Sequence, residues 1–350
     1  MMLLGIREAY ALGIVSIGFR VFFTIYVDNP QTLNSGWITA LAGCLAVLPM
    51  TAALGWVGRS YDKPPAQTLD NAPGRFLFAF VALLSIFDAG MSLSLLSHSS
   101  TYVALEYVPR VWVSLGCVIG VALGCLGGLD AIGSTARVWL RILFFLLVIV
   151  IIAIIPLLKP GLLFPVLGPG IKTLASPVPA IIGITCQVFP LWLLREKPTV
   201  KIWRFSPTSM IIAAGLVSAG LLLLTGMLLP SMPEFPPHRV FQLDKLLTNG
   251  RVSVQLQLPL LFIWFGCYLL AIAFSLVIAT HTVQYAFPGI PRWTAVLICA
   301  IAAFGISLSG MGEKGVIAAA SIIRLCAYTL VTAALVVICV INKKRSGAPE

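Results

Sequence analysis

The 350-residue chain is 59% hydrophobic and only 10% charged, which excludes a water-soluble globular domain and is typical of an integral membrane protein. Its net charge of +11 does not indicate nucleic-acid binding, because most basic residues fall in the segments between long apolar runs. Arg7 and Glu8 lie inside the first apolar run, which excludes a secretory signal peptide there, so we expect this run to remain as an anchor.

Ten apolar stretches are long enough to cross a bilayer, because a spanning helix needs about 20 largely apolar residues. They leave little chain for a soluble domain. The sequence therefore predicts a single all-α integral membrane domain over 1–350. The predicted spans are 6–27, 36–57, 76–101, 111–128, 136–158, 178–194, 208–230, 256–286, 293–311 and 316–341.

Lys and Arg residues between these spans are distributed unequally between the two sides of the membrane. An even number of spans places both termini on one side, which carries fourteen basic residues against seven on the other. By the positive-inside rule, both termini are predicted to be cytoplasmic. The Pro- and Gly-rich segment 158–177 and the segment 231–255, in which a short surface helix is expected, then lie outside.

Two predicted spans carry glycine and polar residues in their middle. These residues occupy matching positions if the chain consists of two repeated halves of five spans, about 1–158 and 178–341. Two interrupted helices in matching positions indicate the binding site of an inverted-repeat transporter, because a broken helix frees backbone groups at mid-membrane. The alternative is that glycine merely allows close helix packing. The residues are Gly13, Ser16 and Gly18 in the first span and Gly183, Thr185, Gln187 and Pro190 in the sixth.

Three ionisable residues, Arg20, Asp88 and Arg324, lie deep in predicted spans. Such groups are costly in the membrane and are therefore paired, exposed to water or functional. Asp88 can pair with either arginine in a contact that only fixes helix register. Alternatively, Asp88 binds a ligand amino group or a coupling proton while an arginine binds a ligand carboxylate. The helix face of Asp88 also carries Ser85, Ser92 and Ser99.

The candidate site combines these groups with the two interrupted spans and with aromatic residues that could form its wall. No Cys or His cluster has metal-ligand spacing and no catalytic motif is found, so the sequence predicts neither an enzyme nor a bound metal or cofactor. The candidate ligand-binding residues are Ser16, Gly18, Phe22, Asp88, Ser92, Gly183, Thr185, Gln187 and Tyr268, with Arg20 and Arg324 as buried charge partners.

Four segments, taken together with their order along the chain, resemble the permease-like B subunits of GerA-type endospore germinant receptors, members of the amino acid–polyamine–organocation superfamily. The second span opens with SGWITALAGCLAV, and the eighth contains FIWFGCYLL around Trp264. Between them lie GLDAIGSTARVWLRI, which matches at Gly128, Ile132 and Arg137, and LLFPVLGPGIKTL, which matches at Pro165, Gly168 and Gly170.

The resemblance implies a ten-helix, 5+5 inverted-repeat permease fold of the LeuT type, an amino-acid-like ligand and partner subunits of A and C type in the spore inner membrane. Two functions remain open. One is a spore germination receptor subunit that binds a small germinant and signals to its partners. The other is a proton- or sodium-coupled secondary transporter of amino acids.

The predicted topology is tested by cysteine labelling. Cysteine introduced at Ser176 or Thr248, in a background without the native cysteines, should react with a membrane-impermeant thiol reagent in right-side-out vesicles. Labelling of these positions from the cytoplasmic face alone would contradict the orientation.

Overall fold

The computed structural model describes residues 6–28, 34–59, 72–103, 107–164, 170–193, 207–228, 257–309 and 314–345. Each of the ten predicted spans corresponds to helical structure in this part of the chain, which confirms the all-α fold class. Among the described residues, seven helical segments are long and apolar enough to cross a membrane, and three further apolar helices are shorter.

The first, second and sixth spans are each divided into more than one helical element. Each of the other spans is formed by one α-helix in the described residues, which in the fifth span continues into η3 (Ile155–Leu157). The first span is α1 (Ile6–Gly13), η1 (Ile14–Gly18) and α2 (Phe19–Asp28); the second is α3 (Gly36–Ala46) and α4 (Leu48–Arg59); the sixth is α10 (Val178–Thr185) and α11 (Val188–Leu193). The single helices are α6 (Ala72–Val103), α7 (Arg110–Leu126), α8 (Leu129–Ile154), α12 (Pro207–Leu228), α14 (Gln257–Ala286), α15 (Arg292–Leu308) and α16 (Lys314–Arg345).

The segment 158–177, expected to be no single straight helix, contains short elements. The structure describes η3 (Ile155–Leu157) just before it, and η4 (Pro160–Leu163) and α9 (Ile171–Ala175) within it. The surface helix predicted in 231–255 lies outside the described residues.

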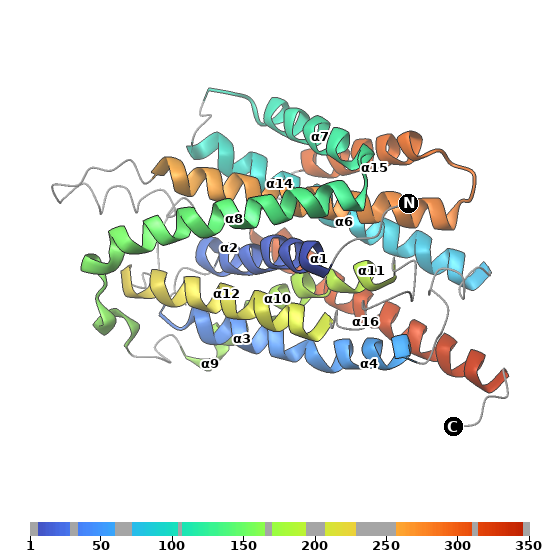
Figure 1. Cartoon of the computed structure of the whole chain (residues 1–350), viewed down its shortest axis with the longest axis horizontal. Helices are drawn as coiled ribbons and strands as arrows, with labels where there is room; N and C mark the ends of the chain where they lie inside the picture. Colours follow the sequence, from blue (N-terminus) through green and yellow to red (C-terminus); the bar gives the residue numbers. More distant parts are fainter. Residues whose placement is uncertain are drawn as a thin grey trace.

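The helices pack in two groups (Figure 1). In one, hereafter the α14 group, α6, α7, α14 and α15 contact one another. In the other, the α12 group, α12 packs on η1, α2 and α3, and α10 packs on α2 and α3. The α14 group contains the third, fourth, eighth and ninth spans, and the α12 group contains the first, second, sixth and seventh spans. Each group therefore consists of two pairs of spans whose members lie five spans apart along the chain. Two repeated halves of five spans would pack in this way; their boundaries at 158 and 178 stay a prediction.

The interior of the bundle is formed mainly by α6 and α14, two predominantly apolar helices. Of the apolar segments in α6 and α14, 72% and 78% are buried, whereas in α8 only 17% is buried. A helix that is apolar all round needs either other helices or lipid around it. On α8 the exposed side chains include Phe144, Phe145 and Ile149, which suits contact with hydrocarbon.

The first span is not interrupted in the way the sequence predicts. Ser16 and Gly18 belong to η1, a π-helical segment that continues α1 directly into α2, so the expectation of a non-helical stretch here is wrong. The Ser16 hydroxyl donates to the Leu12 carbonyl at 2.5 Å, so the span keeps its polar groups bonded within the helix. A π-helical segment is a local insertion in an α-helix and rotates the following helix relative to the preceding one. The position of the irregularity was therefore predicted correctly, but its form was not.

The sixth span is interrupted at the C-terminal end of the stretch expected to be non-helical, Gly183–Gln187, whereas Gly183 and Thr185 themselves are helical. α10 ends at Thr185 and α11 begins at Val188, which leaves Cys186 and Gln187 between the two helices. The turn is held by the Gln187 N–H, which donates to the Ile184 carbonyl at 3.2 Å, and by the Phe189 N–H, which donates to the Cys186 carbonyl at 3.0 Å. The break therefore allows the Gln187 side chain to leave the regular helical surface.

Close packing between α14 and α8 depends on Gly266, where an added Cβ would lie 1.9 Å from Trp139 Cζ2. Gly266→Ala should therefore lower the free energy of unfolding by about 1–3 kcal/mol, measured by thermal unfolding of the detergent-solubilised protein. Gly220→Ala is the matched control, because an added Cβ there meets no atom within 4 Å. Equal melting temperatures for the two variants would contradict this packing.

Candidate functional site

Asp88, on α6, forms ion pairs with two arginines. Arg20 on α2 donates from Nη2 to Asp88 Oδ1 at 3.0 Å and from Nη1 to Oδ2 at 3.1 Å. Arg324 on α16 places Nη2 2.9 Å from Oδ1. The two pairings that the sequence left as alternatives therefore occur together.

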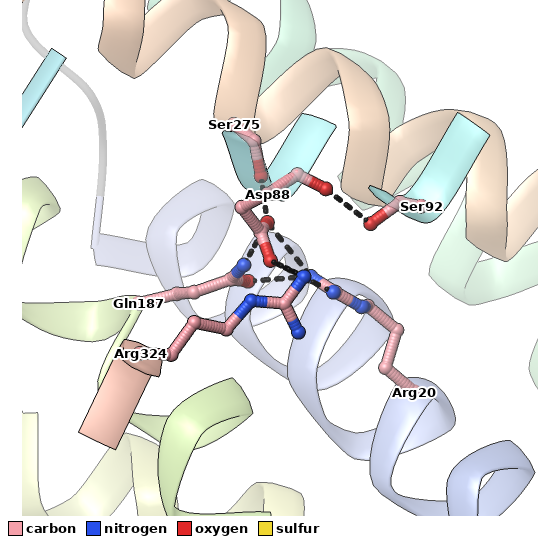
Figure 2. Close-up of polar contacts among 6 residues, drawn as sticks. All are labelled: Arg20, Asp88, Ser92, Gln187, Ser275 and Arg324. Atoms are coloured by element: carbon pink, nitrogen blue, oxygen red, sulfur yellow. Dashed lines mark hydrogen bonds and ion pairs between the residues drawn. The ribbon is translucent and has the colours of Figure 1, made fainter. Parts of the chain in front are cut away.

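Two uncharged side chains complete this set of contacts (Figure 2). Gln187, at the break in the sixth span, accepts from Arg20 Nη1 at 2.8 Å and donates from Nε2 to Asp88 Oδ2. Ser275 on α14 donates to Asp88 Oδ2 at 2.6 Å. We refer to Arg20, Asp88, Gln187, Ser275 and Arg324 as the Asp88 cluster.

All five side chains of the Asp88 cluster are buried, with at most 5% of any residue exposed. An isolated charge in such surroundings is strongly unfavourable, and only close pairing and hydrogen bonding offset the lost solvation. The bidentate contact from Arg20 is the strongest type of carboxylate–guanidinium pairing. The cluster therefore fixes the relative positions of the spans that contribute to it.

The cluster lies between the two helix groups. Arg20 and Gln187 come from the first and sixth spans, in the α12 group, and Asp88 and Ser275 come from the third and eighth spans, in the α14 group. Each of these two pairs is related by five spans, and Arg324 is added from the tenth. Asp88 therefore faces the first, sixth, eighth and tenth spans.

The other candidate residues of these spans make contacts apart from the side chains of the Asp88 cluster. Ser92 Oγ donates to the Asp88 backbone carbonyl at 2.7 Å, and Thr185 Oγ1 donates to the Ile181 carbonyl at 2.9 Å. The Gly18 carbonyl accepts from Ser218 Oγ at 2.8 Å, which ties the first span to α12. Gly183 lies in α10 without a side chain to contribute. The structure thus does not bring these residues into the Asp88 cluster, and their ligand-binding role stays a prediction.

Aromatic residues of α2 and α14 form a second group. Phe23 lies 5.8 Å from Tyr268 and 6.4 Å from Trp264, measured between ring centroids, and Phe22 lies 4.9 Å from Phe23. Trp264 and Tyr268 are 5.5 Å apart. The predicted residues Phe22 and Tyr268 therefore belong to one aromatic wall between the first and eighth spans.

Ser275 is not among the candidate residues predicted from the sequence. Its only signal in the sequence is a serine hydroxyl within the apolar run of α14, a feature too common in membrane helices to be decisive alone. Within the part of the chain that the structure describes, no three His, Cys, Asp or Glu side chains lie where they could hold a metal ion together.

No protein-family model matches the chain, and no curated protein sequence matches it. Chains of solved structures, in contrast, are similar to it. Mhp1, a transporter of the nucleobase-cation-symport-1 family in a closed conformation with bromovinylhydantoin bound, is similar with a TM-score of 0.60 at 13% identity, over 94% of this chain and 77% of Mhp1.

A variant of the manganese transporter from Eremococcus coleocola is similar with a TM-score of 0.61 at 18% identity, over 96% of this chain and 77% of the transporter. A second variant gives 0.60 at 19% identity with the same coverage. The chain therefore has the inverted-repeat permease fold of the LeuT type, and it is a multi-pass membrane protein with a transporter-like architecture.

The charge balance of the Asp88 cluster is tested by Asp88→Asn, which would leave two buried guanidiniums without a carboxylate. We expect a loss of about 3–5 kcal/mol in the free energy of unfolding, measured by thermal unfolding in detergent. The matched control is Glu8→Gln, which breaks the partly exposed pair between Glu8 and Arg137 at 3.5 Å and should cost less than about 1 kcal/mol.

The double variant Asp88→Asn/Arg324→Gln has the same net charge in the cluster as the unmodified protein, because one charge of each sign is removed. We expect it to recover part of the stability lost by Asp88→Asn. If the double variant is no more stable than Asp88→Asn, charge balance does not govern the cluster.

Proposed function

We propose that this chain is a secondary transporter that carries a small amino-acid-like solute across the membrane, driven by a proton or sodium gradient. The observation that supports this most directly is the position of the Asp88 cluster. It joins the α12 group to the α14 group at the point where the sixth span is broken.

Transporters with inverted repeats alternate between two faces of the membrane by moving one group of helices against the other around a site near mid-membrane. In this chain such a motion changes the distance from Arg20 and Gln187 to Asp88 and Ser275, because each pair belongs to a different group. The cluster is therefore where solute binding and helix movement would be linked.

The proposed solute site extends from the Asp88 cluster toward the aromatic wall. It includes the candidate residues Ser16, Gly18, Phe22, Ser92, Gly183, Thr185 and Tyr268, which are carried by the spans that surround the cluster. The two halves of the repeat are proposed to be 1–158 and 178–341, with both termini in the cytoplasm.

A second candidate function is that of the membrane subunit of a germinant receptor in the spore inner membrane, acting with A-type and C-type partner subunits. It rests on the sequence resemblance at Gly128, Arg137 and Gly170. Gly128 and Gly170 have φ of +92° and +84°, a backbone conformation that favours glycine. In a receptor the same site would bind a germinant without moving it across the membrane.

Uptake into proteoliposomes distinguishes these functions. The purified protein should accumulate at least one labelled amino acid under an imposed proton or sodium gradient, and collapse of that gradient with an ionophore should abolish accumulation. Asp88→Asn should reduce uptake per protein molecule at least tenfold, since the contact between the two helix groups depends on its charge, whereas Glu8→Gln should leave it unchanged.

Binding of an amino acid without accumulation under either gradient would contradict the transporter function and favour the receptor. Co-purification with A-type and C-type subunits would then support the second candidate.

A further inference from the structure

The Asp88 cluster contains one more positive charge than negative charge among the residues that the structure describes. Arg20 and Arg324 both contact Asp88, and a guanidinium keeps its proton in proteins. Asp88 is the acidic side chain that pairs with them, so the three groups carry a net charge of +1. A buried excess charge favours binding of an anion.

Asp88 has no acceptor capacity left for a ligand amino group in this arrangement. Its Oδ1 receives Nη2 of both arginines, and its Oδ2 receives Arg20 Nη1, Gln187 Nε2 and Ser275 Oγ. Two carboxylate oxygens accept about four hydrogen bonds, so these donors saturate the group. An amine would have to displace one of them.

Arg324, in contrast to Asp88, still has capacity to form hydrogen bonds with a ligand. Of its nitrogens, Nη2 contacts Asp88, while the buried Nε has no hydrogen-bond partner among the residues that the structure describes. In Figure 2 its other terminal nitrogen points away from Asp88. Arg324 is 5% exposed, and its guanidinium lies over the ring of Phe87, with Cζ 5.9 Å from the centroid. A buried donor without an acceptor is costly and is rare in native proteins.

We infer that the solute site of this chain recognises a carboxylate through Arg324. A carboxylate supplies both the missing negative charge and the acceptor that Nε lacks, and guanidinium–carboxylate contacts are strong and geometrically specific. The substrate class is a small monocarboxylate, including amino acids, whose apolar part would lie against aromatic rings such as Phe87. This inference rests on the proposed function only in taking the cluster as the solute site.

A binding experiment tests this inference without requiring transport. Thermal unfolding of the purified protein is measured with L-alanine, L-leucine and acetate and with their carboxamide counterparts, L-alaninamide, L-leucinamide and acetamide, at matched ionic strength. In each counterpart an uncharged amide replaces the carboxylate. At least one carboxylate should raise the melting temperature, and its amide should not.

Variants of Arg324 and Arg137 test which arginine is responsible for stabilisation by the carboxylate. Arg324→Gln should weaken the response to the carboxylate about 30-fold or more, as for a buried charge-assisted contact, and Arg324→Lys should restore part of it. Arg137→Gln on α8 is the matched control and should respond like the unmodified protein. Without ligand, Arg324→Gln should melt no lower than the unmodified protein, because Arg20 still pairs with Asp88 through two hydrogen bonds and the excess charge is gone.

The inference would be overturned by equal stabilisation by a carboxylate and its amide, by stabilisation by none of the carboxylates, or by an undiminished response in Arg324→Gln. Stabilisation by sodium chloride alone that is lost in Arg324→Gln would assign the site to an inorganic anion and would also overturn it. Carboxylate binding that depends on Arg324, with no uptake into proteoliposomes, would support the inference while contradicting the transporter function.

Discussion

The arrangement of this protein depends on a carboxylate that is 1% exposed and shared by two guanidiniums inside an apolar bundle. In such surroundings the free energy of a charge changes steeply with the distance to its partner, so small displacements are costly. Arg20, Asp88 and Arg324 come from the first, third and tenth spans, and Gln187 and Ser275 add the sixth and eighth. Half of the spans are thereby held in register around one side chain.

Departures from regular helix structure serve this arrangement. Arg20 follows the π-helical segment Ile14–Gly18 by two residues, and Gln187 lies in the break between α10 and α11. A regular helix constrains each side chain to a fixed direction, whereas a π-helical turn or a break re-aims the residues that follow. Both irregularities occur in the α12 group, while Asp88 and Ser275 are presented by uninterrupted helices of the α14 group.

Much of the fold was predictable from sequence because the bilayer imposes a length and a composition on every span. Asp88, Arg20 and Arg324 could be selected as buried because an ionisable residue deep in an apolar run needs a partner. That both arginines would share Asp88 was not predictable, since the depth of a residue in a span says little about its direction. Ser275 was missed because a hydroxyl can satisfy itself on its own helix, as Ser16 and Thr185 do. The irregularity in the first span was located from glycines, but glycine alone does not distinguish a π-helical turn from a break.

The two shortest unbroken spans have a consequence for the surrounding lipid. α7 and α15 each contain 17 residues and pack against each other, so this flank of the molecule offers helices about 25 Å long. The hydrocarbon core of a typical bilayer is about 30 Å thick, and the mismatch is relieved by local thinning at a cost of fractions of a kcal/mol per Å. The protein is therefore better matched to membranes of shorter acyl chains. A change in membrane thickness would act on the α14 group through its contacts with lipid.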